Sequence, residues 1–358
     1  MEIPDILFFK PNRVWRTYSG GRCLDLLEGK PNPSDSHFPE DWIASTIKAT
    51  NIGREHITDE GFSYVEIQSK SYLLKDLFQQ FPSEFVGAEH YNKFGPNTQF
   101  LTKLLDSAIR LHLQAHPTIS FSKKYLNSNS GKTEAYVILS VREEIENPYV
   151  LIGFQNPLSK ADFKETVLHQ DINRMLGCFE RIPVAPGDVF VVPGGLPHAI
   201  GEGILMIEIM EPTDFVVRLE FERGGYALPE QSRFMGRDID FAVEMTTFDK
   251  ISVEEVKRNF FCSPSIINTE GESIEYSLVD SKKTPCFSVN KLEVRKRYSK
   301  SSDSFYIGVV TSGSGQIDSP SQHYELKAGD KFLVPHKTEE VHFTSGHELQ
   351  VYFMFPPK

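Results

Sequence analysis

Short apolar runs separated by turn residues dominate the first two thirds of the chain. Residues 111–117, LHLQAHP, alternate between apolar and polar positions, and residues 136–139 form a β-branched and aromatic run. Residues 189–192 form a continuous apolar run that ends at Pro193 and two glycines. Such runs are typical of strands that bury one or both faces. The pattern therefore predicts a mainly β fold.

Two segments have helical spacing instead. Residues 71–82, SYLLKDLFQQFP, repeat apolar residues at helical intervals and stop at a proline, which predicts a short helix. Residues 159–181 carry an apolar stripe, and Ser159 can cap the first turn. His169 falls within this second helical segment, where we expect it on the surface rather than at a metal.

Composition narrows the class of protein. The chain has 358 residues, 39% of them hydrophobic and 24% charged, and its net charge of −11 argues against nucleic acid as a partner. We expect no membrane span and no secretory signal, because the apolar runs are short and the N-terminus lacks a basic start; a cytoplasmic location follows. The cysteines show no CxxC spacing, so we expect reduced thiols at positions 23, 178, 262 and 286.

Candidate chemistry gathers in three of the apolar segments. Gln114 and His116 share one strand face, Lys132 and Glu134 share another, and His198 follows the turn after residues 189–192. An amide oxygen, imidazoles and a carboxylate form a mixed N/O ligand set, which suits Zn²⁺ or another divalent first-row ion. Without thiolates, a closed structural zinc site is not expected, so the sequence predicts an open site with Gln114, His116, Glu134 and His198 as ligands.

The third segment also fits a known pattern. Gly187, Pro193, Gly195 and His198 match the G-x5-P-x-G-x2-H frame that resembles the second half of a cupin barrel. Cupins are small double-sheet, jelly-roll-like barrels that place metal ligands on facing hairpins. The resemblance implies such a barrel, with a small helical part attached to it, over residues 1–235.

The C-terminal part repeats that frame incompletely. Gly329 and Pro335 match it, but Lys337 and Glu340 stand where the glycine and the histidine would be. Residues 286–298 alternate cleanly, and residues 305–317 read as a strand and a glycine-bearing turn. We therefore expect a second cupin barrel, over residues 236–358, that lacks the metal ligands.

Longer motifs narrow the resemblance to one family. The segments QAHP at 114–117, GKTE at 131–134, PHAI at 197–200, EIMEPTDFVVR at 208–218 and PEDWIAST at 39–46 resemble class I mannose-6-phosphate isomerase. The resemblance implies a metal-dependent aldose–ketose isomerase that acts on a small sugar phosphate. It also favours strand, turn and strand over residues 98–113, where the apolar spacing alone fits a helix equally well.

The family motifs also imply roles for individual residues. Arg218 falls at the position of the family's catalytic arginine, and Lys132 would contact substrate oxygens in the same cavity. A simpler interpretation makes Arg218 an ion-pair partner of Glu220 or Glu222 on its own strand face. The base that transfers the proton stays open. Further substrate contacts are expected from His112, Trp42, Ser45, Glu211 and Asp214.

Departures from the family pattern keep alternatives open. His112 stands where the family usually has serine, and Thr118 and Ile119 replace acidic residues after His116. These changes leave the metal ligands intact but affect the end of the pocket where a phosphate would bind. The alternatives are an isomerase of another, unphosphorylated aldose, a cupin oxygenase, which Gln114 fits poorly, and a sugar-sensing cupin without turnover. Oligomeric state and native metal stay open.

Overall fold

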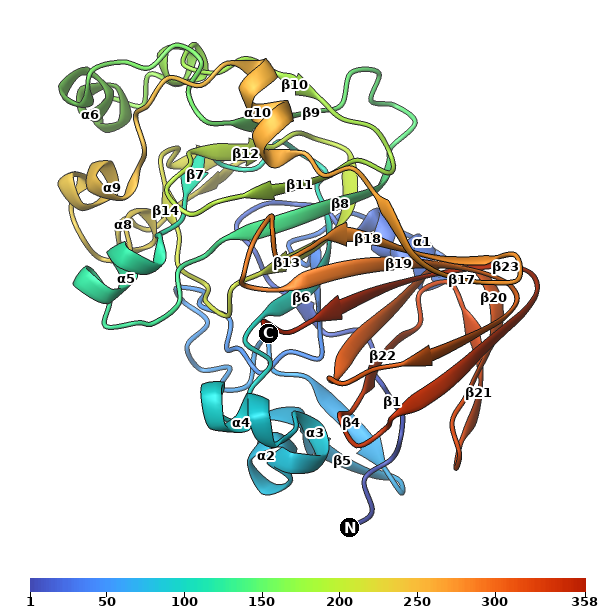
Figure 1. The fold of residues 1–358 in the computed structure, drawn as a ribbon. Helices are drawn as coiled ribbons and strands as arrows, with labels where there is room; N and C mark the ends of the chain where they lie inside the picture. The colour runs from blue at the N-terminus through green and yellow to red at the C-terminus, as the bar shows by residue number, and fades with distance from the viewer.

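The computed structural model describes residues 1–358 and is mainly β, as the apolar pattern predicted (Figure 1). Two sheets make up most of the N-terminal part, and neither closes on itself through hydrogen bonds. The six-stranded sheet has the order β11 (Val189–Val192), β8 (Glu134–Val141), β13 (Ile204–Met210), β6 (Leu101–Asp106), β3 (Glu40–Ile43) and β2 (Arg13–Val14). The five-stranded sheet has the order β10 (Ile182–Pro183), β9 (Tyr149–Ile152), β12 (His198–Ile200), β7 (Gln114–Ala115) and β14 (Val217–Arg218).

A third sheet forms most of the C-terminal part. Its eight strands are β1 (Leu7–Phe8), β22 (Lys331–Val334), β20 (Tyr306–Asp318), β23 (Glu340–Phe355), β19 (Ser288–Ser301), β18 (Ser273–Val279) and β17 (Ser265–Glu270), with β21 (His323–Lys327) paired to β20. It is also open in its hydrogen bonding. Two hairpins complete the strands: β4 (Tyr64–Ile67) with β5 (Lys70–Leu73), and β15 (Glu222–Arg223) with β16 (Tyr226–Ala227).

Ten short helices cover the sheets, and none of them is long and apolar enough to cross a membrane. Figure 1 shows α5, α6, α8 and α9 gathered at the end of the molecule away from the eight-stranded sheet. The helices are α1 (Arg22–Leu27), α2 (Leu74–Gln80), α3 (Pro82–Phe85), α4 (Ala88–Phe94), α5 (Ile119–Tyr125), α6 (Lys160–Leu168), α7 (Ile172–Leu176), α8 (Glu230–Arg233), α9 (Ile239–Met245) and α10 (Val253–Phe260).

The six-stranded sheet is buried on both faces. Along β8, Tyr136 and Ile138 pack in a cluster with residues of the five-stranded sheet, whereas Ala135 and Val137 pack in a second cluster with the eight-stranded sheet. Side chains alternate between the faces of a strand, so both faces need apolar residues. This double burial explains why β8, β11 and β13 read as continuous apolar runs in the sequence.

The two predicted helices are present with different limits. The prediction for residues 71–82 was wrong at its start, because residues up to Leu73 pair with β4 and the helix α2 begins at Leu74. Pro82 does not end this segment but occupies the first turn of α3. The segment 159–181 is divided into α6 and α7, and Ser159 caps α6 as predicted.

The ambiguous segment before the first ligand is a strand, not a helix. Residues 101–106 form β6, and the chain then runs without regular structure until β7 begins at Gln114. Pairing with β13 and β3 on either side stabilises β6, and this outweighs its helical apolar spacing.

The predicted glycine turn within residues 305–317 is absent, because β20 continues through it as one bulged strand. Its register against β23 shifts between Gly313 and Gln316. Gly313 has a φ of +78°, and a Cβ there would lie 1.9 Å from the carbonyl oxygen of Glu348. The glycine thus permits a bulge and a close backbone approach, which is the other common reason for glycine in a strand.

Residues on either side of position 235, the predicted boundary between the two barrels, pair and pack with each other. β1, near the N-terminus, pairs with β22, and Lys331 of β22 forms a buried ion pair with Asp41 of β3. In the other direction, Phe261 stacks on Phe190 at a centroid distance of 5.0 Å. The two parts therefore share strands, charges and core.

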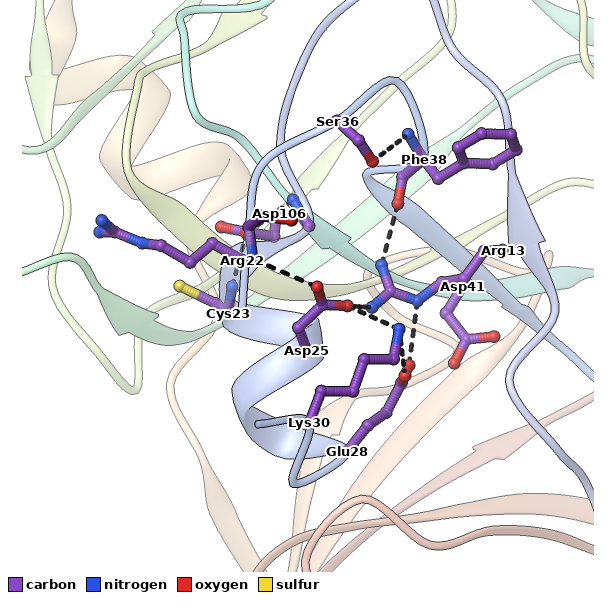
Figure 2. Close-up of polar contacts among 12 residues, drawn as sticks. Arg13, Arg22, Cys23, Asp25, Glu28, Lys30, Ser36, Phe38, Asp41 and Asp106 are labelled. Atoms are coloured by element: carbon purple, nitrogen blue, oxygen red, sulfur yellow. Dashed lines mark hydrogen bonds and ion pairs between the residues drawn. The ribbon is translucent and has the colours of Figure 1, made fainter. Parts of the chain in front are cut away.

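The helix α1 is held by residues that lie outside it (Figure 2). Its N-cap position is a glycine without a side chain, and the carboxylate of Asp106 instead accepts hydrogen bonds from the amides of Gly21 (2.8 Å) and Cys23 (2.9 Å). The same carboxylate pairs with Arg142 at 2.8 Å and is fully buried. On the helix itself, Asp25 pairs with Arg13 at 2.6 Å.

Replacing Asp106 by alanine should destabilise the protein by about 1–3 kcal/mol, because two backbone amides lose their buried acceptor while Arg142 keeps only its pair with Asp35 at 2.6 Å. Urea unfolding would measure this loss. The control Glu66→Gln removes an exposed ion pair with Lys10 and should stay within about 0.5 kcal/mol of the parent. Equal effects for the two variants would contradict the role given to Asp106.

Candidate metal centre and pocket

The candidate site lies between the five-stranded and the six-stranded sheets. β7 and β12 lie side by side, so Gln114 is the register partner of His198, while β14 brings Arg218 to the other side of Gln114. Glu134 faces them from the start of β8. The facing of two sheets therefore brings together residues that are up to 104 positions apart in the chain.

Three of the four predicted ligands form one buried cluster. The ligand atoms of His116, Glu134 and His198 all lie within 4.8 Å of one another, and each residue is only 1% exposed. His116 Nε2 lies 3.2 Å from Glu134 Oε1, and His198 Nε2 lies 3.4 Å from Glu134 Oε2. This arrangement is the one a metal ion held by two imidazoles and a carboxylate requires.

Both imidazoles are oriented through their other nitrogen. His116 Nδ1 lies 2.8 Å from the carbonyl oxygen of Phe215, and His198 Nδ1 lies 2.9 Å from that of Leu196. A carbonyl only accepts, so each Nδ1 carries the proton and each Nε2 presents its lone pair to the cluster. Burial lowers the pKa of His116 to about 3, so this ring is neutral.

Two atoms of the cluster are buried without any hydrogen-bond partner, His116 Nε2 and Glu134 Oε1. Buried polar atoms are normally satisfied, and a divalent cation between them would satisfy both. Burial opposes ionisation of Glu134, but the cationic Lys132 Nζ, 3.3 Å away, helps to hold the pKa of its carboxyl well below the ordinary value. The residues present thus fit a metal.

Gln114, the fourth predicted ligand, borders the cluster through its amide. Its Nε2 lies 3.3 Å from His198 Nε2. A half-turn of the amide about χ3 exchanges nitrogen and oxygen with little other change, which would direct Oε1 to the same place. The structure therefore brings all four predicted ligands together.

Two glycines hold the His116 segment in place. A Cβ at Gly194 would lie 2.4 Å from the carbonyl oxygen of Pro117, and one at Gly131 would lie 2.7 Å from the same atom. Only glycine lets both loops approach this backbone. The loops that precede Glu134 and His198 therefore pack against the segment that carries His116, and this brings the three candidate ligands together.

Charged side chains line a pocket beside the cluster. It contains about 40 Å³ of free space and is bordered by Arg218, Lys132, His112 and Asp214, all predicted site residues, with Gln114 and Glu134 at its metal end. This volume is close to that of one or two water molecules, so side chains must move to admit a hexose.

Arg218 does not form the ion pair that its sequence context suggested. Glu220 pairs with Arg110 through both oxygens, at 2.6 and 2.7 Å, and Glu222 points elsewhere in an exposed hairpin. Arg218 instead donates from Nη1 to the carbonyl oxygen of Ser232 at 3.0 Å. Burial lowers its pKa, although Asp214 opposes this. Its guanidinium is therefore a pocket group without a carboxylate in salt-bridge contact.

Asp214 and His112 lie in the pocket with defined partners. Asp214 pairs with Arg16 at 3.2 Å. Burial raises the pKa of Asp214, but the charge of Arg16 lowers it by more, so the carboxylate is charged. His112 Nδ1 lies 3.0 Å from the carbonyl oxygen of Glu220, and burial lowers the pKa of His112 to about 4. The ring is neutral, and its buried Nε2 has no hydrogen-bond partner.

The remaining predicted residues lie outside the pocket lining. Trp42 is fully buried and donates to Glu40 at 2.7 Å, and Ser45 bonds to the backbone of Ile47. The carboxylate of Glu211 accepts from the amides of Gly131 and Thr133, each at 2.9 Å. In the structure these three residues support the loops and strands around the site.

Sequence reasoning missed a chain of charges along the pocket. Glu208 pairs with Lys103 at 3.1 Å, Lys103 with Glu40 at 3.3 Å, and Glu40 with Arg16 at 2.8 Å. Burial raises the pKa of Glu208 to about 8. One signal could have revealed this chain of charges: Lys103 and Glu208 each lie in a fully buried strand, where a charge needs a partner or a function.

Comparison with known proteins gives a consistent result. The family model for mannose-6-phosphate isomerase, cupin domain, matches residues 281–354. "Probable mannose-6-phosphate isomerase GmuF" of Bacillus subtilis is 32% identical over 240 residues, 66% of this chain and 68% of that protein. "Mannose-6-phosphate isomerase ManA" of the same organism is 27% identical over 334 residues, 92% of this chain and 93% of the relative.

Solved structures share the fold at lower identity. The mannose 6-phosphate isomerase from Bacillus subtilis superimposes with a TM-score of 0.74 at 22% identity, covering 98% of this chain and 99% of the other. A mutant of phosphomannose isomerase from Salmonella typhimurium gives 0.70 at 15% identity, covering 99% and 100%. The likeness extends over both halves of the chain.

The sheets, the match to the cupin-domain model and the buried His-Glu-His cluster, which could hold a metal ion, define a cupin protein. The 32% identity to GmuF extends over about two thirds of both chains and identifies the family within the cupins. The chain belongs to the mannose-6-phosphate isomerase family.

Replacing His198 by alanine should lower the metal content of the purified protein from near one ion per chain to a small fraction of that, because one of two imidazole ligands is lost. Elemental analysis after dialysis would measure it. The matched control His169→Ala removes an imidazole that is 75% exposed at the C-cap of α6 and should keep the metal. Unchanged metal in His198→Ala would remove this histidine from the ligand set.

Proposed function

We propose that this chain interconverts mannose 6-phosphate and fructose 6-phosphate with one Zn²⁺ per chain. The observation that carries the proposal is the buried N/O cluster with two unpartnered atoms, which adjoins through Gln114 and Glu134 a pocket lined by Arg218, Lys132 and Glu208. The family of the chain supports the substrate, since its named relatives are mannose-6-phosphate isomerases.

The reaction moves a proton between two neighbouring carbons of an open-chain sugar and develops negative charge on an oxygen. A zinc ion held by Gln114, His116, Glu134 and His198 would supply Lewis acidity to the sugar oxygens. The chain must then supply a fixed positive charge, a proton acceptor and a site that excludes water.

Arg218 and Lys132 are the cations that can meet developing charge. Arg218 makes no salt bridge and holds its position through Ser232, so its charge is available to the substrate. Lys132 lies 3.3 Å from Glu134 and is 5% exposed, so it can hold a substrate oxygen next to the ligand cluster. A fixed cation in a dry pocket stabilises an enediolate more strongly than one in water.

Glu208 is the group we assign to proton transfer. A carboxyl whose pKa is near 8 can both accept and return a proton close to neutral pH. Lys103 lies 3.1 Å away and can follow the change in charge, because Glu40 also holds it. Asp214 is less suited, since Arg16 keeps it charged with a lowered pKa; we assign it to substrate hydroxyls.

A second candidate function has its own supporting observation. The neutral ring of His112 offers a buried, unpartnered Nε2 to the pocket, and such an atom accepts a hydrogen bond from a sugar hydroxyl but offers nothing to a phosphate dianion. This favours an isomerase of an unphosphorylated aldose. A coupled assay with mannose 6-phosphate and with free mannose, on zinc-loaded and chelator-treated protein, distinguishes the two functions.

We also interpret the architecture as two cupin barrels. The facing six-stranded and five-stranded sheets share one core and would form the metal-binding barrel of residues 1–235. The eight-stranded sheet wraps its own apolar cluster and would form a metal-free barrel within residues 236–358. β1 would then be a segment that the first unit adds to the second.

Replacing Arg218 by alanine should reduce kcat by about 10²–10³-fold while leaving zinc content unchanged, because it removes charge stabilisation in the transition state. Steady-state kinetics with mannose 6-phosphate and elemental analysis would measure both. Arg181→Ala, which removes an exposed arginine stacked on Tyr149, is the matched control and should retain parental kcat. Full turnover in Arg218→Ala would exclude the arginine from the mechanism.

Replacing Glu208 by glutamine should lower kcat by about 10²–10⁴-fold with little change in KM, because shape and Lys103 contact persist while the proton acceptor is lost. In D₂O the variant should also lose incorporation of solvent deuterium into the sugar. Glu222→Gln, on an exposed hairpin, provides the matched control. Normal deuterium incorporation by the Glu208 variant would assign proton transfer to another group.

A further inference from the structure

A second and larger cavity lies between the α4 segment and the eight-stranded sheet. It has a volume of about 1310 Å³ and is bordered by α4, by the strands β18 and β19 and by the last residues of the chain. None of its lining residues borders the metal pocket. Binding sites for small molecules have volumes of roughly 300–1,000 Å³, so this cavity can hold a ligand of more than one sugar ring.

A buried polar network lies in the wall of this cavity. Glu275 of β18 pairs with Lys300 of β19 at 2.7 Å, and both side chains line the cavity while only 4% and 6% of each residue is exposed. Asn290 donates to Glu275 at 2.8 Å, and the hydroxyl of Tyr298 donates to it at 2.7 Å. Lys300 Nζ also lies 5.2 Å from the ring centroid of Phe355.

Stability alone does not explain this network. A buried ion pair contributes little compared with apolar residues of the same size, because both charges lose their hydration. Two further atoms nearby are buried without a partner, the hydroxyl of Tyr306, whose ring contacts Phe355 at 5.4 Å, and Nδ1 of the cavity residue His336. Unsatisfied polar atoms beside a cavity are typical of a ligand site.

The lining indicates the class of ligand. Six carboxylate side chains face the cavity against three lysines, so its field is unfavourable to a phosphate or another anion. Many of the other lining groups are hydroxyls, and phenyl rings accompany them. Hydroxyl, amide and carboxylate groups together with aromatic faces match a ligand that has both hydroxyls and apolar C–H faces. The hydroxyl residues are Ser277, Ser281, Thr284, Ser288, Ser301, Ser302 and Ser304.

We propose that this cavity binds a neutral, unphosphorylated saccharide, which accepts hydrogen bonds from Lys300 and Asn290, donates one to Glu275 and packs against Phe355. The site is separate from the metal pocket, so the binding does not depend on the proposed isomerase reaction. It gives the metal-free half of the chain a ligand of different charge from a sugar phosphate.

Isothermal titration of the full-length, zinc-loaded protein with cellobiose, maltose and mannobiose tests the proposal. We expect saturable binding of at least one disaccharide. Ser277→Trp should weaken that binding at least 10-fold by filling the cavity while both members of the ion pair are retained, and Glu275→Gln should weaken it through the lost carboxylate. The control is Glu293→Gln. Glu293 lies on β19, as Lys300 does, but pairs with Lys291 outside the cavity, so this variant should bind as the parent does.

Several outcomes would overturn the proposal. They are the absence of binding by the parent protein to every disaccharide of the panel, binding that survives Ser277→Trp, and stronger binding of inorganic phosphate at the Ser277-sensitive site. Thermal unfolding of each variant checks that it is folded under the conditions of the titration. If Glu275→Gln does not fold, Ser277→Trp still decides, because Ser277 is only half-buried and carries none of the network's hydrogen bonds.

Discussion

The inner face of the six-stranded sheet carries charges that must be satisfied away from water, and the pocket depends on this constraint. Glu208 and Lys103 are register partners on adjacent strands, and their ion pair is extended by Glu40 and Arg16. Breaking such a pair exposes one uncompensated buried charge, so the strands are fixed in register by electrostatics as well as by packing. The apolar residues of that face pack against the five-stranded sheet.

The fixed register of these strands also holds the candidate ligands in place. Glu134 lies on the same face of β8 as Tyr136, which is itself paired with Glu208 across to β13. The two histidines come from the facing sheet and its loops, and each is oriented by a backbone carbonyl through Nδ1. Metal ligands held from two packed sheets move little relative to each other, which favours a preformed site.

The two pockets of the molecule differ in volume and in the charge of their lining. The pocket beside the His-Glu-His cluster is small and is lined by four cations and four carboxylates, whereas the second cavity is large and has an excess of carboxylates. The shared core, the pairing of β1 with β22 and the ion pair between Asp41 and Lys331 keep the halves together. The two pockets therefore differ in volume and in charge balance, while the sheets that carry them share one core.

The sequence by itself determined the strand-rich fold and singled out the candidate ligands and Arg218, because apolar periodicity, turn residues and motif spacing are local properties. Only the tertiary structure decided that Leu73 belongs to a strand, that Arg110 rather than Arg218 pairs with Glu220, and that Glu211 supports a loop. It alone brought Glu208 beside Lys103 and built the second cavity. Strand pairing and burial join residues far apart in the chain, and their energies depend on partners that no local pattern specifies.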